Sequence, residues 1–488
     1  MDHEVVLDAG GRLMAWTTYE RILVGSMNYI ENCATEQTVH GQDPWFLITS
    51  KLNEDGSFRR NQNNQASNAY YAVETLRRYY PYTGDGLAQA PIRLLLDRVL
   101  EYRTPADWKW PDVPRTQDNS PDGVYDDETS EVDKICMVGI ACLRFARMTG
   151  EEKYVEAAKR IAETVLAHVD TGDEERSPLP FRVNLKSGEV LDSYTAGMVF
   201  CSIFFDEVAA LGGPQRDRCL AARDTLWEWV LRYPISNQRW SGYYEDVRNN
   251  RDNLNQQIPL ETARRMLERF DDRSEYAQHI PALIEWVRNR FGRTKRRGAT
   301  SIREQDGCFE EMSSHTARYA SVVAGWWALC EQRGLLDPER RAALYEEARS
   351  SFALCTYSTW SKHSIGDRAL NYVGLGYIDP WFSDSYFDFL PHLLDGLAFL
   401  PSLNAPGQVR LLRSTDTMRQ VEYKDGGMTY ETVSDTGEEW LLCPFSPRLE
   451  SGGVEVPKDR WIHGPWLGAE KILRLRRAGE RSVTLSPR

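Results

Sequence analysis

An acidic pair inside an aromatic loop is the sharpest chemical signal in the sequence. Glu245 and Asp246 follow Tyr243 and Tyr244, shortly after Trp240. A sugar ring stacks its C–H face on an aromatic side chain, while carboxylates bind its hydroxyls. Inverting hydrolysis of a glycosidic bond needs one protonated carboxylic acid and one ionised carboxylate, about 6.5–9.5 Å apart. The loop therefore predicts that Glu245 or Asp246 acts as acid or base on a sugar.

Two further carboxylates lie inside apolar helical stretches. Asp133 stands between Val132 and Ile135, and Glu261 follows Leu260. A bare buried charge is prohibitive, so each must be paired or have a shifted pKa. Asp133 pairing with Lys134 is the structural alternative to catalysis, and both readings stay open. The second carboxylate of a hydrolase is expected at a position such as Asp133 or Asp384. Other acids near predicted helix starts also fit helix capping: Asp126, Asp127, Glu128, Glu131, Asp192 and Glu304.

A histidine motif supports a different chemistry. Abstraction of the proton next to a uronate carboxyl needs a base and a cation that neutralises the carboxyl. His315, Arg318 and Tyr319 are spaced to share one helix face. In this reading His315 and Tyr319 transfer protons, while Arg318 or Arg182 holds the carboxylate. Capping by His315 and ordinary ion pairing by Arg318 are the structural alternatives.

Substrate contacts are expected from aromatic and amide side chains in the long loops. We expect a sugar to be held by Trp110, Tyr125, Tyr244 and Trp381. Glu261 and the amide-rich run 253–257, which includes Gln256, offer partners for hydroxyls. Amide-rich loops are also simply soluble, so that alternative remains.

Cofactor motifs are nearly absent. The stretch 118–128 resembles the start of a calcium loop, with Asp118, Ser120 and Asp122 as oxygen ligands, but position 12 is Thr129 instead of Glu. No HExxH, no Walker loop and no GxGxxG after a strand occurs. We expect no metal and no cofactor, with calcium at that loop as the open alternative.

The elements that position these residues follow a twelvefold helical pattern. Apolar residues at helical spacing predict six segments, at 67–80, 130–148, 193–212, 258–268, 314–332 and 384–399. Short links follow the first five and lead into a second set, at 88–103, 152–169, 215–233, 275–291 and 337–355, with 14–31 as its sixth member. Short links make neighbouring helices antiparallel. The pattern predicts an all-α fold, an (α/α)6 toroid.

Long loops connect the second set back to the first. They cover 32–66, 104–129, 170–192, 234–257, 292–313 and 356–383. Loops of this length usually carry function. The alternation places all six at one end of the barrel, where we expect them to surround a common cavity.

The pattern changes after Pro401. Segments 408–413, 418–424, 428–433, 439–443 and 470–475 are β-rich, with hairpin turns predicted at 424–427 and 434–437. We therefore divide the chain into a toroid, 1–401, and a small antiparallel β region, 402–488, packed on it. Its strand count argues against an independent carbohydrate-binding module.

Composition excludes several classes of protein. The 488 residues carry a net charge of −13, which argues against nucleic acid, because its recognition needs a basic surface. No apolar run approaches the ~20 residues that span a bilayer, and no leader pattern is present. Nine cysteines without a CxxC pair indicate buried thiols in a reducing compartment. We expect a cytoplasmic protein with a small-molecule or oligosaccharide substrate and no nucleic-acid or membrane partner; the oligomeric state is open.

Several motifs together resemble bacterial six-hairpin glycosidase-type proteins. They are Trp108–Pro114, Glu131–Lys134, Tyr243–Asp246, Pro259–Arg264, Ser314–Tyr319 and Trp381–Asp384, and the resemblance spans most of residues 10–400. It implies the (α/α)6 fold and carbohydrate as the substrate class. Members include inverting glycosidases, unsaturated glucuronyl hydrolases, polysaccharide lyases and uronate epimerases, and fold alone does not choose among them.

Three functions follow from these observations. The first is a glycoside hydrolase with two carboxylates, and the second is a polysaccharide lyase or uronate epimerase that uses His315 and Tyr319. The third is a biosynthetic cyclase or a glycan-binding protein on the same fold. Against a cyclase, the chain lacks a DxDD motif, and 124–129 holds only a fragment of a DDxxD cluster.

Overall fold

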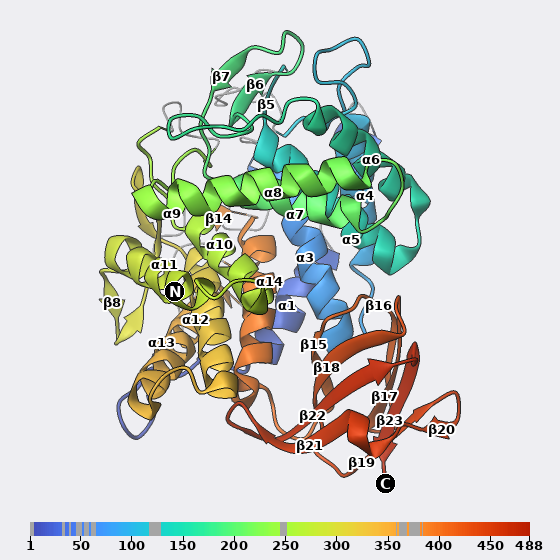
Figure 1. The fold of residues 1–488 in the computed structure, drawn as a ribbon. Helices are drawn as coiled ribbons and strands as arrows, with labels where there is room; N and C mark the ends of the chain where they lie inside the picture. Colours follow the sequence, from blue (N-terminus) through green and yellow to red (C-terminus); the bar gives the residue numbers. More distant parts are fainter. Residues whose placement is uncertain are drawn as a thin grey trace.

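A computed structural model of the chain describes residues 4–31, 65–116, 128–244, 251–357 and 384–488, together with short strands between these ranges. Figure 1 shows a helical barrel with a β region at one end. No helix among the described residues is long and apolar enough to cross a membrane.

Six helices of the described chain form the inner ring. Each contacts the next in sequence, and the last contacts the first, so the ring is closed. Most residues of the inner helices are buried on all sides, as expected for helices covered by a second layer. The six are α3 (Gln65–Thr83), α5 (Val132–Thr149), α7 (Met198–Ala209), α10 (Gln257–Glu268), α12 (Ser313–Arg333) and α14 (Asp384–Phe399).

Six more helices form the outer layer. Each contacts an inner helix and presents an apolar stripe to it, as α6 does with Tyr154, Ala158 and Ile161. They are α1 (Tyr19–Glu31), α4 (Gln89–Glu101), α6 (Glu152–Leu166), α8 (Arg216–Arg232), α11 (Tyr276–Phe291) and α13 (Pro338–Thr356). These twelve helices lie at the twelve predicted segments, so the toroid prediction is confirmed. A single extra turn, α9 (Pro234–Asn237), follows α8.

Turn residues explain why the helices reverse where they do. Gly150 and Gly334 end α5 and α12 with φ of 79° and 66°, a left-handed conformation that glycine adopts without strain. Asp337 caps α13, its side chain accepting from the backbone N–H of Arg340 at 2.9 Å. Short, sharply ended links hold each pair antiparallel.

Small strands tie the long loops together at the N-terminal end of the inner helices. β5 (Thr129–Glu131), β6 (Arg182–Asn184) and β7 (Val190–Asp192) join the second loop to the third, and are seen above the barrel in Figure 1. β14 (Trp381–Phe382), β3 (Lys51–Leu52) and β4 (Phe58–Arg59) join the sixth to the first. β10 (Arg303–Gln305) and β11 (Cys308–Glu311) belong to the fifth, which bridges to the fourth between Asn255 and Gln305. The described parts of all six loops therefore gather at one end.

Three further hairpins, with strands of two or four residues, complete the set of small strands. They are β1 (Thr35–Thr38) with β2 (Gly41–Pro44), β8 (Lys295–Arg296) with β9 (Ala299–Thr300), and β12 (Thr359–Trp360) with β13 (Arg368–Ala369).

The C-terminal region is a pair of antiparallel sheets with its own apolar core. One sheet has the order β15 (Arg410–Ser414), β18 (Thr436–Leu442), β22 (Ala469–Ala478), β21 (Trp461–Trp466). The other has the order β16 (Met418–Lys424), β17 (Gly427–Thr432), β23 (Ser482–Pro487), β19 (Pro447–Ser451), β20 (Val454–Glu455).

The C-terminal region differs from the prediction in two respects. Five strands were expected, and four were missed, because prolines and charges in 447–466 and 482–487 obscure the alternation. The predicted hairpin at 434–437 is wrong, since β17 and β18 belong to different sheets. The other turn is confirmed: Asp425 and Gly426 both have positive φ between β16 and β17.

The β region packs on the C-terminal end of α3. The Tyr80 hydroxyl accepts from the backbone N–H of Val421 at 3.0 Å, and the Tyr423 hydroxyl donates to the Pro81 carbonyl at 2.7 Å. The two ends of the barrel therefore differ: the long loops surround one, and the β sheets cover the other.

Candidate active site at the mouth of the toroid

A buried arginine organises the N-terminal end of the inner ring. Arg318 of α12 donates through Nε to Glu261 of α10 at 3.1 Å and through one amino group to His315 Nδ1 at 3.0 Å. Its other amino group donates to the Tyr71 hydroxyl of α3 at 3.2 Å and to Asp388 of α14. Four inner-helix side chains thus meet on one guanidinium, and we call this group the mouth cluster.

The contact with Arg318 fixes the tautomer of His315. A guanidinium can only donate, so Nδ1 accepts and the ring proton sits on Nε2. Nε2 lies 3.5 Å from Glu304 Oε1 of β10 and makes no hydrogen bond within the described residues. His315 therefore presents an N–H that is free to exchange with a ligand.

His392 of α14 repeats this arrangement on the other side of Asp388. Arg264 donates to its Nδ1 at 3.0 Å, and its Nε2 lies 3.5 Å from Asp388 Oδ1 without a hydrogen bond in the described part of the chain. Burial, together with Arg318 and Arg264, lowers the pKa of His392 well below its usual value. The imidazole is thus held neutral, with its proton on Nε2.

Asp388 stands between the two histidines. Burial raises the pKa of this carboxyl; Arg318 and His315 oppose the rise, while Glu261 and Glu304 add to it. A carboxyl with a raised pKa exchanges its proton nearer to neutral pH than an ordinary aspartate does. The mouth therefore places a carboxyl with a raised pKa, suited to proton transfer, between two imidazoles.

Tyrosines and glutamines form one wall of the cluster. The Tyr244 ring meets His315 edge-on, with centroids 6.4 Å apart, and its hydroxyl accepts from Gln256 Nε2 at 3.2 Å. Gln257 donates to the hydroxyls of Tyr71 and Tyr243. Burial raises the pKa of all three phenols well above the usual value, so they stay protonated. Gln256 Oε1 has no hydrogen-bond partner among the described residues.

Asp133 is buried beneath this wall. Its side chain is 0% exposed and lies 3.3 Å from Lys134 Nζ, which also donates to the Tyr243 carbonyl. Burial raises the pKa of Asp133 to about 7, although Lys134 acts to lower it. Asp133 thus pairs with Lys134, as the structural alternative expected, and Lys134 in turn holds the Tyr243 carbonyl. A catalytic role for Asp133 remains a prediction.

The predicted residues Arg182 and Trp110 have partners other than His315 and His392. Arg182 donates to Asp192 at 3.2 Å and to the Tyr244 carbonyl at 3.1 Å, so it holds the loop that carries Tyr244. Trp110 is 2% exposed and stacks on His168, with centroids 3.8 Å apart.

Tyr319 departs from the expected shared helix face. Its hydroxyl donates to Glu347 of α13 at 2.8 Å and accepts from Arg288 of α11 at 2.9 Å. It therefore faces the outer layer, and the predicted face holds for His315 and Arg318 only.

Several predictions fall outside the described residues. They concern Glu245, Asp246, Tyr125 and the calcium loop with Asp118, Ser120 and Asp122, together with the side chains of Asp384 and Trp381. Asp384 begins α14, and Trp381 pairs with Leu52 in β14. Within the described residues, no group of three or more His, Cys, Asp and Glu is placed to hold a metal.

Sequence reasoning missed Tyr71, Asp388 and His392. A usable signal existed for the last two, because both lie in an apolar helix at i, i+4 spacing. Asp133 was singled out on similar grounds, as a polar side chain inside an apolar helix. Tyr71 had no such signal, because a tyrosine in an apolar helix is usual in a core.

Below the mouth, the axis of the ring is polar. Arg264 pairs with Asp395 at 2.7 Å and donates to Ser321 at 2.8 Å, and Arg78 pairs with Asp395 at 2.6 Å and with Glu74 at 2.5 Å. Burial acts to raise the pKa of Asp395, but Arg78 and Arg264 outweigh it and hold the pKa below its usual value. Ion pairs therefore join α3, α10 and α14 below the mouth.

Several solved structures match this architecture. A cellobiose 2-epimerase from Spirochaeta thermophila matches with a TM-score of 0.56 at 9% identity, covering 79% of this chain and 95% of that one. A D-mannose isomerase matches with a TM-score of 0.55 at 11% identity, covering 78% and 96%. The chain has the six-hairpin (α/α)6 toroid fold. A glycoside hydrolase family 76 mannosidase from Bacteroides thetaiotaomicron shares the toroid at a TM-score of 0.51 and 10% identity, covering 77% and 98%. No family model and no curated protein matches the sequence.

In this toroid the inner helices all start at the mouth. The inner helices therefore deliver four side chains of the mouth cluster, Tyr71, Glu261, His315 and Asp388, from four separate segments of the sequence, and β10 adds Glu304 beside them. Such convergence of titratable groups on one buried centre is typical of an active site.

Proposed function

We propose that the protein is a carbohydrate-active enzyme, and that it epimerises or isomerises a sugar by proton transfer at the mouth. The observation that carries the proposal is His315, whose Nδ1 is held by Arg318 while Nε2 is free of hydrogen bonds among the described residues. The solved toroids with the highest TM-scores quoted above are a sugar epimerase and a sugar isomerase, which supports the same substrate class.

The cations of the site favour a neutral sugar over a uronate. Arg318 is 0% exposed and donates to Glu261, His315, Tyr71 and Asp388, which occupies four of its five N–H groups. Arg182 also donates within the protein. Neither is set to bind a substrate carboxylate, so Arg318 positions the groups around it.

The chemistry follows from the two exchanging groups. Asp388, as the carboxylate, takes the proton from the carbon next to the carbonyl of an open-chain sugar, while the Nε2–H of His315 protonates the carbonyl oxygen. The resulting enediol gives the isomer when the proton returns to the neighbouring carbon, or the epimer when it returns to the opposite face. The deprotonated Nε2 takes the proton of an enediol hydroxyl when the new carbonyl forms, and Arg318, which donates to Nδ1, stabilises the ring until then.

A glycoside hydrolase is the second candidate. The specific observation in its favour is the raised pKa of Asp388, because glycoside hydrolysis needs a carboxylic acid that keeps its proton. Its partner would be one of the acids proposed from the sequence, Glu245 or Asp246, which directly follow Tyr244 of the wall.

Solvent exchange separates the two chemistries. Neutral aldoses, ketoses and reducing disaccharides are incubated with the protein in D2O, and proton NMR follows the C–H signal next to the carbonyl. We expect deuterium to enter that position. His315→Asn keeps an acceptor for Arg318 but removes Nε2, so it should lower the exchange rate by about 10²- to 10⁴-fold.

The matched control is His279→Asn, on the outer helix α11, which should keep the wild-type rate. Exchange that survives in His315→Asn would contradict the assignment of this histidine. Release of new reducing ends from glycosides without deuterium uptake would support the hydrolase instead. A wild-type protein that does neither would refute the proposal.

A further inference from the structure

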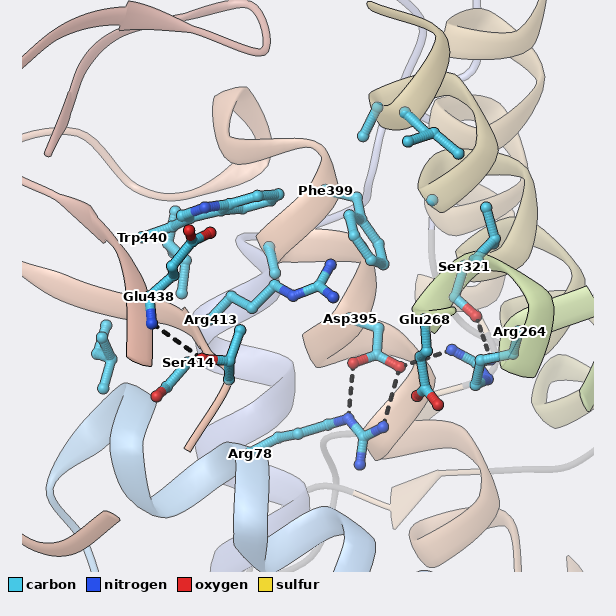
Figure 2. A pocket seen from close by; sticks show the side chains of 18 of the residues that line it. Arg78, Arg264, Glu268, Ser321, Asp395, Phe399, Arg413, Ser414, Glu438 and Trp440 are labelled. Carbon is cyan, nitrogen blue, oxygen red and sulfur yellow. Dashed lines mark hydrogen bonds and ion pairs between the residues drawn. The ribbon is translucent and has the colours of Figure 1, made fainter. Parts of the chain in front are cut away.

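A cavity lies at the opposite end of the ring from the mouth. It has a volume of about 560 Å³ and is lined by the C-terminal ends of α3, α10, α12 and α14 and by strands β15 and β18. Figure 2 shows Arg78, Arg264 and Asp395 on the helical side and Arg413 and Trp440 on the β side. We call it the base cavity.

Arg413 is the unpaired cation of the base cavity. Its guanidinium lies 5.0 Å from the ring centroid of Phe399 and 5.1 Å from that of Trp440. In the described part of the chain it has no ion pair and no hydrogen bond. The neighbouring Arg78 and Arg264 both pair with Asp395. Burial lowers the pKa of Arg413, although Asp395 and Glu268 act to raise it. A half-buried charge without an acceptor is unfavourable, and a bound anion relieves that cost.

The surroundings of Arg413 suit a hydroxylated ligand. Phe399 and Trp440 offer aromatic surface beside the guanidinium, and Ser414 and Thr415 bring hydroxyls to the same wall. Glu438, exposed at the rim, can accept from ligand hydroxyls. The fork of a guanidinium matches the paired oxygens of a carboxylate or a phosphate.

We propose that the base cavity is a second ligand site, which binds a small hydroxylated oxyanion through Arg413, such as a sugar acid or a sugar phosphate. It is a binding site and not a second catalytic centre. Asp395, the buried carboxylate of its wall, is held ionised by two arginines and has no proton to donate. The site is independent of the chemistry proposed for the mouth.

Calorimetry with defined probes tests the site. D-glucuronate, D-glucose 6-phosphate and neutral D-glucose are titrated into the full-length protein at up to millimolar concentration. We expect at least one anionic probe to bind, and D-glucose to bind more weakly at this site. Arg413→Gln removes the charge and should weaken anion binding on the order of 10- to 100-fold. Arg413→Lys keeps the charge but lacks the planar guanidinium, so its anion affinity should lie between those of the wild type and of Arg413→Gln.

Two matched variants locate the binding. Arg419→Gln, exposed on β16 of the same β region, should bind as the wild type does. His315→Asn, at the mouth, should also keep anion binding, so failure at the mouth and failure at the base are distinguishable. Thermal unfolding checks that each variant folds.

The anionic probe that binds identifies the source of the oxyanion: a carboxylate, a phosphate ester, or either one. Wild-type protein that binds neither anion refutes the proposal. So does unchanged anion binding in a folded Arg413→Gln, or loss of anion binding in His315→Asn with retention in Arg413→Gln.

Discussion

At the scale of single residues, arginines set the protonation of the histidines at the mouth. Arg318 and Arg264 each donate to the Nδ1 of one imidazole, which places the proton on Nε2 in both. Neither arginine is positioned to touch a substrate, because each is engaged with carboxylates and with a histidine. Their role is to orient His315 and His392 and to fix their tautomers.

Asp133 gives a prediction for the pH dependence of stability. Its pKa is about 7 in the folded protein and about 3.9 in the unfolded chain. Between these values the folded state holds a proton that the unfolded state has lost. The free energy of unfolding therefore falls as pH rises, and the stabilising contribution is present below about pH 4 and lost through about pH 7. Asp133→Asn, which mimics the protonated carboxyl, should not show this loss.

The measurement is urea unfolding of wild type and variant between about pH 5 and pH 8, with the difference in free energy plotted against pH. The difference should grow in favour of Asp133→Asn as pH rises. Asp217→Asn, a highly exposed site on α8, should follow the wild type at every pH. A difference for Asp133→Asn that stays constant would mean that this carboxyl is ionised throughout.

Single residues were also where sequence reasoning was least complete. It placed His315 and Arg318 on one helix face from their spacing, and the two side chains do lie in contact at 3.0 Å. It placed Tyr319 on the same face, but the Tyr319 hydroxyl finds Glu347 and Arg288 in the outer layer instead. Contacts between distant segments, such as Arg318 with Tyr71, depend on ring closure and leave no local pattern in the sequence.

At the scale of elements, the inner helices approach closely through glycines. A Cβ on Gly139 of α5 would lie 2.3 Å from the Phe204 ring of α7. Gly139→Ala should therefore destabilise the protein by about 1–3 kcal/mol through overpacking, which exceeds the gain of up to about 1 kcal/mol in helix propensity.

Gly325→Ala in α12 is the matched control for that prediction. Its nearest neighbour would be a terminal methyl group of Leu267 at 3.1 Å, which can move aside. Thermal unfolding of both variants should show a lower midpoint for Gly139→Ala than for Gly325→Ala. Equal midpoints would mean that α5 and α7 are not packed as closely as the structure has them.

The positions of the helices were the most predictable part of the structure. Helical periodicity and Gly or Pro links located all twelve helices, because each must bury an apolar face and reverse direction within a few residues. The β region was predicted less well, since four of its strands carry prolines or charges and β17 and β18 lie in different sheets. Strand pairing between distant segments is set by packing that local alternation does not report.

At the scale of the whole molecule, the toroid has two chemically different ends. The mouth holds a carboxyl with a raised pKa between two histidines, whereas the base cavity holds Asp395 with a lowered pKa and an unpaired arginine. The base cavity is not proposed as the catalytic end, because proton transfer needs groups whose pKa values lie near the working pH. Arg264 lies between the two, with contacts to His392 on one side and Asp395 on the other.

Proton transfer at the mouth is best tested by a crystal structure of the protein with D-mannitol, a reduced sugar that cannot undergo the proposed reaction. We expect mannitol in the mouth, with a hydroxyl within about 3.2 Å of His315 Nε2. Mannitol bound only elsewhere, or a mouth that stays free of ligand at saturating mannitol, would contradict proton transfer at the mouth.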